Sequence, residues 1–425
     1  MYQLRITGKI TCGLFAVLCF CSANVTLFAR GQDEMNTHPA TTSRGLEIPM
    51  ERRYYDTSHS EGITGRLFPN IHGGDAVHFD YLYSGGVFTN TRGGVRKGMV
   101  YNGIAELSMT ADTEKLGLWK NGTFYSYSIF SHGPTISDSS GDYQGVTVFA
   151  YETPAQVAQY WYQHSFLDGK VIVKLGKQDT SADFFVLPAT ANFVNSSATC
   201  IPTTSIPAVP DSAWGVAGWW EVTDNFCLKA GIYDAHPFGD AFWISDTGNA
   251  YSSYQIERHH SLANRLPGFT FFGAWYDSSS MELLGSGEER TGRYGFATGI
   301  EQMVYRRNAR DKEDMRGLTA FFQYGWTEKN QGDLKDYFGT GFQFLGLFES
   351  RPNDSLGFSV NIVRFSDGYR KDEEIQFAYE AAYELYYKIQ LTENCVLQPD
   401  FQYIVHPGGE YKNSFVPGVI FQVVF

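Results

Sequence analysis

Hydrophobic and polar residues alternate along most of the chain after about residue 77, in segments of roughly ten residues. The last segment is the clearest example. One row contains Phe415, Pro417, Val419, Phe421, Val423 and Phe425, and the other contains Val416, Gly418, Ile420, Gln422 and Val424. Because successive side chains of a strand point to opposite faces, this segment predicts a strand with one lipid-facing and one interior-facing row.

Segments 101–110, 318–326 and 383–391 repeat this two-row pattern, and their second rows include Glu106, Gln323 and Lys388. Several rows carry Tyr, Phe or Trp near their ends, where transmembrane strands cross the membrane interface. A soluble β-sandwich also alternates, but one face of each of its strands forms a dry core. The number of segments and their polar second row therefore favour a transmembrane barrel.

The connections between segments alternate between short and long. Asp168-Gly169-Lys170 predicts a tight hairpin turn, whereas residues 188–210 and 236–266 are irregular and rich in Ser, Asn and Pro. Short turns on one rim and long loops on the other are typical of outer-membrane barrels. The predicted fold class is all-β, a transmembrane antiparallel barrel of about 16 strands, with 16–18 as the range, around a polar lumen.

Composition narrows the alternatives. The 425 residues carry a formal net charge of −13, and 16% of them are aromatic. Acidic residues spread along the chain argue against a nucleic-acid partner, and the aromatic content excludes disorder. A mean hydropathy of −0.27 excludes a helical membrane bundle.

The first residues predict export. Arg5 and Lys9 precede an apolar stretch that ends in small residues, so residues 1–29 are interpreted as a signal peptide cleaved after Ala23 or Ala29. A buried N-terminal helix is the alternative. Residues 30–65 are polar and aperiodic and are predicted to be a periplasmic leader, which leaves residues 66–425 for the barrel. The expected location is the bacterial outer membrane.

Cysteine usage fits an exported chain. Three of the six cysteines lie within residues 1–29, and Cys200, Cys227 and Cys395 remain. An oxidising compartment would permit a disulfide between Cys200 and Cys227, since one lies in a Pro-rich loop and the other follows a turn. Three isolated small hydrophobic residues are the alternative.

Motifs for catalysis or metal binding were not found. The chain has no nucleophile elbow, phosphate-binding loop or metalloprotease helix motif. His259 and His260 are expected in a long loop, and as adjacent residues of a strand they would point to opposite sides, so no metal site is predicted there. The sequence therefore predicts no enzyme, no metal and no cofactor.

The inward polar rows supply the candidate pore-lining residues. They are Arg96, Glu106, Trp161, Gln163, Lys174, Lys177, Asp179, Glu384, Lys388 and Gln390. Charged and amide groups bind sugar hydroxyls, and aromatic rings cover the C–H faces of a sugar. For each charged residue the alternative is a solvated wall or rim charge. Alternation with Gln159 and Gln163 places Trp161 inward, and a membrane-interface position is the alternative.

Collinear motifs resemble a known family. They occupy residues 93–98, 107–119, 160–170, 176–179, 193–197, 230–234, 384–391, 397–400 and 407–409, with Phe425 terminal. Together they resemble the carbohydrate-selective porins of the OprB type over residues 85–425. The resemblance implies a 16-stranded, monomeric barrel that passes glucose and other sugars through a constriction lined by Arg, acidic and aromatic residues. The Trp- and Gly-rich opening of that family is not recognisable around residues 61–74.

The expected function is passive, carbohydrate-selective diffusion through an outer-membrane barrel. A general or small-ion porin, a barrel enzyme and a secreted glycan-binding sandwich are the alternatives. Expected partners are small sugars, outer-membrane lipid and the barrel assembly machinery, which would act through the strand ending at Phe425. The expected oligomeric state is a monomer, with a trimer as the alternative.

Overall fold

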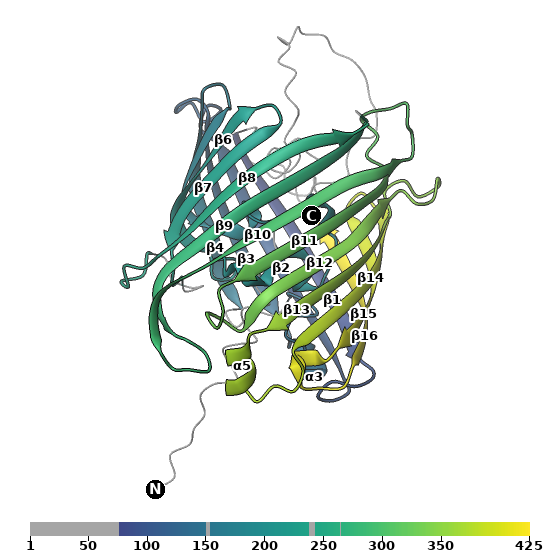
Figure 1. The fold of residues 1–425 in the computed structure, drawn as a ribbon. Helices are drawn as coiled ribbons and strands as arrows, with labels where there is room; N and C mark the ends of the chain where they lie inside the picture. The colour runs from purple at the N-terminus through teal and green to yellow at the C-terminus, as the bar shows by residue number, and fades with distance from the viewer. Residues whose placement is uncertain (1–75, 150–153, 238–242, 264) are drawn as a thin grey trace.

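The alternating segments form strands that pair in chain order and close on themselves (Figure 1). The computed structural model describes residues 76–149, 154–237, 243–263 and 265–425. Within them lie β1 (Val77–Asn90), β2 (Gly98–Asp112), β3 (Gly122–His132), β4 (Ala155–Phe166), β5 (Val171–Gln178), β6 (Ala213–Thr223), β7 (Phe226–Asp234), β8 (Ala250–Leu262), β9 (Leu266–Glu282), β10 (Glu289–Arg306), β11 (Gly317–Thr327), β12 (Leu334–Leu345), β13 (Ser355–Phe365), β14 (Tyr379–Thr392), β15 (Cys395–Val405) and β16 (Ser414–Val424). The closed, antiparallel 16-strand barrel confirms the predicted fold class.

Short helices occur only between strands in the described part of the chain. They are α3 (Ser137–Ser140), η2 (Thr180–Ala182), η3 (Pro188–Thr190), α4 (Ser196–Thr199), η4 (Pro202–Thr204), α5 (Asp367–Asp372) and η5 (Pro407–Gly409). No helix in the described ranges is long and apolar enough to cross a membrane. The predicted signal peptide and leader lie outside the described residues, and so does the start of the predicted barrel range before residue 76.

The two rims of the barrel differ in their connections. One, the short-turn rim, has the connections 113–121, 167–170, 224–225, 263–265, 307–316, 346–354 and 393–394. The other, the long-loop rim, has 91–97, 133–154, 179–212, 235–249, 283–288, 328–333, 366–378 and 406–413, and it includes α3 and α5, which lie at the same end of the barrel in Figure 1. The predicted hairpin turn is present, with left-handed backbone at Leu167, Asp168 and Gly169.

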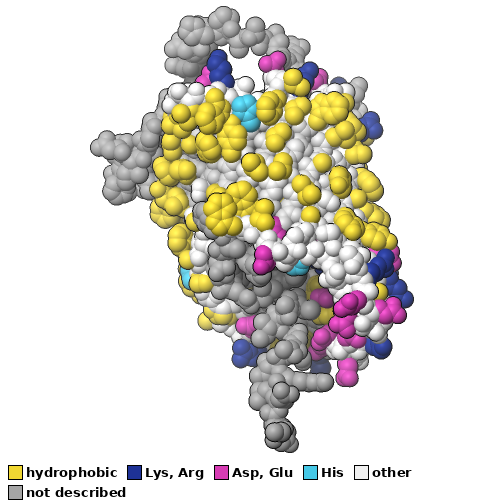
Figure 2. All heavy atoms as spheres, turned by 90° about the vertical axis from the view of Figure 1, so that its left-hand side faces the viewer, with side chains coloured by type: hydrophobic (Ala, Val, Ile, Leu, Met, Phe, Trp, Pro, Cys, Tyr) yellow, Lys and Arg dark blue, Asp and Glu magenta, His cyan; other side chains and the backbone are white. Residues whose placement is uncertain are grey.

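The two rows of each strand face opposite sides of the wall, as predicted. On β16, Phe415 and Val419 are exposed on the outer surface, whereas Val416 and Ile420 are buried inside. The same holds on β14 for exposed Leu385 and buried Glu384. Figure 2 shows hydrophobic side chains spread over the outer wall, with most charged side chains toward the two ends. This arrangement is the apolar band of a transmembrane barrel.

Two sequence predictions about local structure are wrong. Residues 250–262 of the predicted long loop form β8, and His259 and His260 lie on that strand. The inner row of β8 contains Tyr251, Ser253, Gln255 and Glu257, and the outer row also has polar residues, Ser252 and Arg258. Because both rows contain polar residues, the apolar–polar alternation that marks a strand is weak here. Such a strand needs its neighbours to be recognised.

The predicted Cys200–Cys227 disulfide is also wrong, because Cys227 is a thiol. Cys227 is not a loop residue: it is the second residue of β7, and its buried side chain belongs to the apolar cluster inside the barrel. The positions of Cys200 in a loop and Cys227 after a turn do not determine the direction of the Cys227 side chain, and a disulfide requires that direction to be right.

Candidate functional site: the inward-folded loop

Residues 179–212, the connection between β5 and β6, fold into the barrel. Phe184, Phe185 and Phe193 of this loop are almost fully buried. Their rings contact Tyr233 of β7, Phe271 of β9 and Tyr386 of β14, with centroid separations of 6.4, 6.3 and 4.9 Å. A loop that starts at β5 and reaches β14 crosses the lumen. It therefore narrows the barrel and provides much of its apolar core.

Side chains of the wall accept hydrogen bonds from the backbone of this loop. The Glu301 carboxylate accepts from the Ala189 N–H (2.7 Å), and the Gln255 amide oxygen accepts from the Phe185 N–H (2.7 Å). The Glu384 carboxylate accepts from the N–H groups of Val194 (2.6 Å) and Asn195 (3.1 Å). These bonds satisfy loop donors that have been taken away from water.

Three further bonds fix the middle of the loop against β8, β14 and β15. Lys388 Nζ donates to Asn192 Oδ1 (2.8 Å), and Gln398 Nε2 donates to the Asn192 carbonyl (2.9 Å). The Tyr251 hydroxyl donates to the Thr204 carbonyl (2.8 Å). The loop is therefore held along its length by opposite sides of the barrel.

One carboxylate binds both a second loop, residues 133–154, and the loop 406–413. Glu380 of β14 accepts from the N–H groups of Tyr143 (2.7 Å) and Gln144 (3.0 Å), and from Gly408 N–H of the loop 406–413 (2.6 Å). The two inward loops also touch, since Ser196 N–H donates to the Gly145 carbonyl (3.0 Å). The inner face of β14 thus anchors three loops of the long-loop rim.

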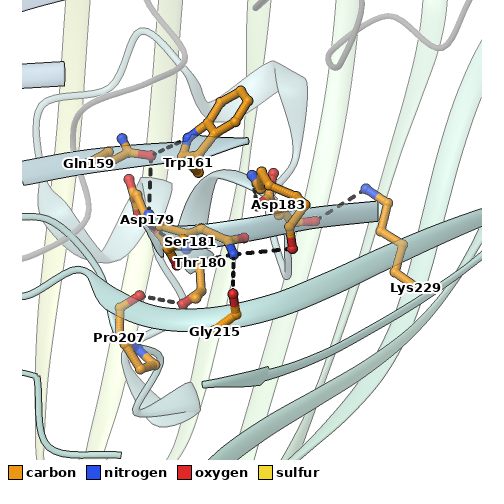
Figure 3. A network of polar contacts seen from close by, with 12 residues as sticks. Gln159, Trp161, Asp179, Thr180, Ser181, Asp183, Pro207, Gly215 and Lys229 are labelled. Carbon is orange, nitrogen blue, oxygen red and sulfur yellow. Dashed lines mark hydrogen bonds and ion pairs between the residues drawn. The ribbon is translucent and has the colours of Figure 1, made fainter. Parts of the chain in front are cut away.

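The start of the inward loop is a polar network (Figure 3). Asp179 caps η2 by accepting from the backbone N–H (3.0 Å) and hydroxyl (2.7 Å) of Ser181, and its own N–H donates to Gln159 Oε1 (3.2 Å). Burial, assisted by the nearby charge of Asp183, raises the pKa of the Asp179 carboxyl to about 6.

Two buried lysines hold Asp183 in that network. Lys174 forms an ion pair with the Asp183 carboxylate. Its Nζ lies 5.0 Å from the ring centroid of Trp161 and 5.1 Å from that of Trp219, which is cation–π geometry. Lys229 Nζ donates to the Asp183 carbonyl (3.2 Å) and pairs with Glu257 (2.9 Å). Removing one member of such a group leaves an uncompensated buried charge.

The structure brings five of the predicted pore-lining residues to this loop. Trp161 faces inward as predicted, but it is 4% exposed because it is stacked on Tyr125 and covered by Lys174. The others are covered as well: Lys174, Asp179, Glu384 and Lys388. These residues contact the loop and do not line open lumen.

The remaining predicted residues lie elsewhere. Lys177 pairs across the sheet with Tyr160 and Trp214, so it belongs to their outer row and not to that of Trp161. Arg96 is exposed in the loop 91–97 at the long-loop rim. Glu106, Gln163 and Gln390 are half-buried, face inward and lie nearer the short-turn rim.

Toward the short-turn rim the inner wall is less covered. There the Asp80 carboxylate accepts from the Ser108 hydroxyl (3.2 Å) and bonds to His78 Nε2 (3.0 Å), yet 47% of its side chain stays accessible. The Glu106 carboxylate accepts from the Tyr127 hydroxyl. These groups offer hydrogen-bonding positions that water or a solute can reach.

Sequence reasoning missed several anchors of the loops, namely Asp183, Lys229, Gln255, Glu301, Glu380 and Gln402. The Gln402 amide donates to the Val146 carbonyl (2.9 Å) and accepts from the Asn195 amide (3.2 Å). Some of these anchors could have been found. Glu380 shares the inward row of Glu384 and Lys388 at a spacing of four, and Lys229 lies in the inward row of β7. Asp183 carries no such signal, because its position depends on the path of an irregular loop.

Comparison with known proteins agrees with this architecture. The family model "Carbohydrate-selective porin, OprB family" matches residues 96–425. Porin B of Pseudomonas aeruginosa is 23% identical over 368 residues, which is 75% of this chain and 80% of that protein. The putative porin QuiX of Acinetobacter baylyi is 23% identical over 316 residues, covering 64% and 69% of the two chains.

Solved structures show the same fold. The high-pH structure of Pseudomonas putida OprB has a TM-score of 0.78 at 22% identity and covers 87% of this chain and 99% of that one. The low-pH structure of the same protein has a TM-score of 0.56 at 20% identity, with 87% and 100% covered. Since the family model matches well over half of the chain, this protein belongs to the OprB family of carbohydrate-selective porins of the outer membrane.

Proposed function

We propose that small neutral sugars such as glucose diffuse passively through this barrel, past the constriction made by residues 179–212. The observation that carries the proposal is the loop itself, which crosses the lumen of a 16-strand barrel and is held by buried polar groups on several strands. A narrow, preorganised passage discriminates solutes by size and by hydrogen bonding, without energy coupling.

Selectivity in this proposal is divided between two sets of residues. Glu106, Gln163 and Gln390 contact the sugar hydroxyls from the half-buried inner wall, together with Asp80. Lys174, Asp179, Glu384, Lys388 and Trp161 act through the loop, because they hold it in place and are covered by it. Contacts to the sugar must stay weak, since a tight site would slow release.

Export and assembly complete the proposal. Residues 1–29 direct the chain across the inner membrane, and the strand ending at Phe425 engages the barrel assembly machinery. The monomer is the proposed functional unit, because strands of one chain are sufficient to anchor the loop that narrows the lumen.

Liposome swelling tests the sugar preference. The full mature protein is reconstituted, and swelling is measured with neutral hexoses and with amino acids and anions of matched size. Swelling faster for hexoses is the expected result. Equal rates for all three solute classes would contradict the proposal and leave a general porin.

A further inference from the structure

The loop 91–97, between β1 and β2, carries an unusual set of cations for a chain with a net charge of −13. Arg92, Arg96 and Lys97 are all exposed. Lys412 is also exposed, in the neighbouring loop 406–413 between β15 and β16. The two loops are joined, since Gly94 N–H donates to the Lys412 carbonyl (2.9 Å).

These four cations lie on both sides of the seam where the barrel closes. β1 pairs with β16 from Leu82–Val424 to Phe88–Gly418, and an isolated bridge continues the pairing at Arg92 and Phe415. Residues directly opposite in an antiparallel pair share one face of the sheet. The ring of Phe415 is on the outer surface, so Arg92 emerges on the membrane-facing side, at the end of the apolar band.

The scaffold beneath the cations is rigid. Asn90 is fully buried, and its amide donates to the carbonyls of Gly93 (3.0 Å) and Arg96 (2.8 Å) and accepts from the Ser414 hydroxyl (2.8 Å). Gly93 has a φ of 68°, and a Cβ at that position would lie 1.9 Å from the Asn413 carbonyl oxygen. The cations therefore project from a fixed turn that has closed onto the neighbouring loop.

No ion pair within the described residues neutralises these four cations. Elsewhere on the rims, cations do have acidic partners: Lys120 pairs with Glu114, Lys329 with Asp367 and Arg364 with Asp336. Asp138 and Glu410 are exposed on neighbouring loops but form no ion pair with the cluster. Val95 and Met99, also exposed, add apolar surface beside it.

We propose that Arg92, Arg96, Lys97 and Lys412 bind the phosphate groups of phosphorylated lipid headgroups in the outer leaflet, and so bridge the seam between the first and last strands. The location of the four cations favours lipid over other anionic ligands. The cluster lies at the long-loop rim, which faces outward in such barrels, and its outward side continues the lipid-facing row of β16. Clusters of basic residues next to a membrane segment recognise anionic lipid, and guanidinium groups bind phosphate in bidentate geometry.

The test compares lipid retention by the intact porin and by two matched variants. One carries Arg92→Gln, Arg96→Gln and Lys97→Gln at the seam. The control carries Lys115→Gln, Lys120→Gln and Lys170→Gln, which removes the same charge from exposed positions near the short-turn rim. Each protein is purified with bisphosphorylated lipid A or its dephosphorylated form, and bound lipid is counted by native mass spectrometry.

The seam variant is expected to lose affinity for phosphorylated lipid by about fivefold per cation removed, while the control keeps it. The heat-modifiable gel shift of the seam variant should also move to lower temperature in phosphorylated lipid only, which separates lost bridging from misfolding. Equal retention of both lipid forms by the intact protein would overturn the proposal. So would a seam variant that binds lipid normally but changes the ion selectivity of the channel, since the cluster would then serve solutes at the pore mouth.

Discussion

Glu301, Glu380 and Glu384 each direct a carboxylate from the barrel wall toward backbone N–H groups of a loop. In a lumen filled with water such groups would line the channel, as the sequence suggested for Glu384. Here the loops cover them, and the carboxylates replace the water that the loop backbone has lost. At the residue scale, therefore, buried carboxyl groups of the wall hold the loops in place.

Asp179 gives this arrangement a pH dependence. Its pKa is raised to about 6, whereas an unfolded aspartate titrates near 4. The docked state holds the proton more tightly, so the contribution is fully present below about pH 4 and is lost as the pH rises through about 6. The difference corresponds to at most about 3 kcal/mol for docking of the loop.

Hydrogen–deuterium exchange of residues 180–189, corrected for the intrinsic pH dependence of exchange, should accordingly show stronger protection at pH 4 than at pH 7. Asp179→Asn keeps an acceptor for Ser181 and should make protection the same at both values. A wild-type protein whose protection rises with pH would show that the raised pKa does not govern docking.

At the scale of elements, the inward loop and β14 form one unit. Glu384→Ala removes the acceptor of two loop N–H groups, and an unsatisfied buried donor costs about 1–3 kcal/mol. We expect a loosened loop, which appears as higher and noisier single-channel conductance and weaker block by sugars. Because no strand pairing is changed, the heat-modifiable gel shift should be retained.

Glu393→Ala, at the exposed turn that ends the same strand, is the matched control and should leave conductance unchanged. Glu384→Gln keeps one acceptor oxygen and should fall between the wild type and Glu384→Ala. Unchanged conductance in Glu384→Ala would mean that the loop does not set the width of the passage.

At the scale of the whole molecule, the outer surface of the barrel wall contacts lipid and the inner surface contacts the lumen. Val419 is exposed at the centre of β16 on the outer row, and Gln422 lies on the inner row of the same strand. Val419→Arg should lower the free energy of unfolding in a bilayer by about 2–4 kcal/mol, because it places a charge in hydrocarbon. Gln422→Arg should change it little. Equal effects in urea titrations of the reconstituted barrel would contradict the assignment of the two faces.

The sequence was sufficient to predict which side of the wall a residue faces where apolar and polar residues alternate regularly. It was insufficient where that alternation is weak or absent. Alternation on β14 and β16 correctly separated Leu385 from Glu384 and Val419 from Val416, because a period of two is a local property. Alternation also places Lys177 in the outer row, three residues after inward Lys174 in an unbroken register. Lys177 was predicted to line the pore only because it lies near a strand end. Alternation missed β8, where polar residues lie in both rows.

By itself, the sequence predicted the fold class, the approximate number of strands, the apolar outer row and the family resemblance, since each depends on short-range periodicity or collinear motifs. The alternation of aromatic and polar residues therefore identified strands that are present in the structure. Only the tertiary structure decided what those residues do. The path of residues 179–212 across the lumen depends on contacts between positions more than a hundred residues apart, such as Ala189 with Glu301 and Val194 with Glu384. No local pattern records such contacts, because they form when the closed barrel brings distant strands around the same loop.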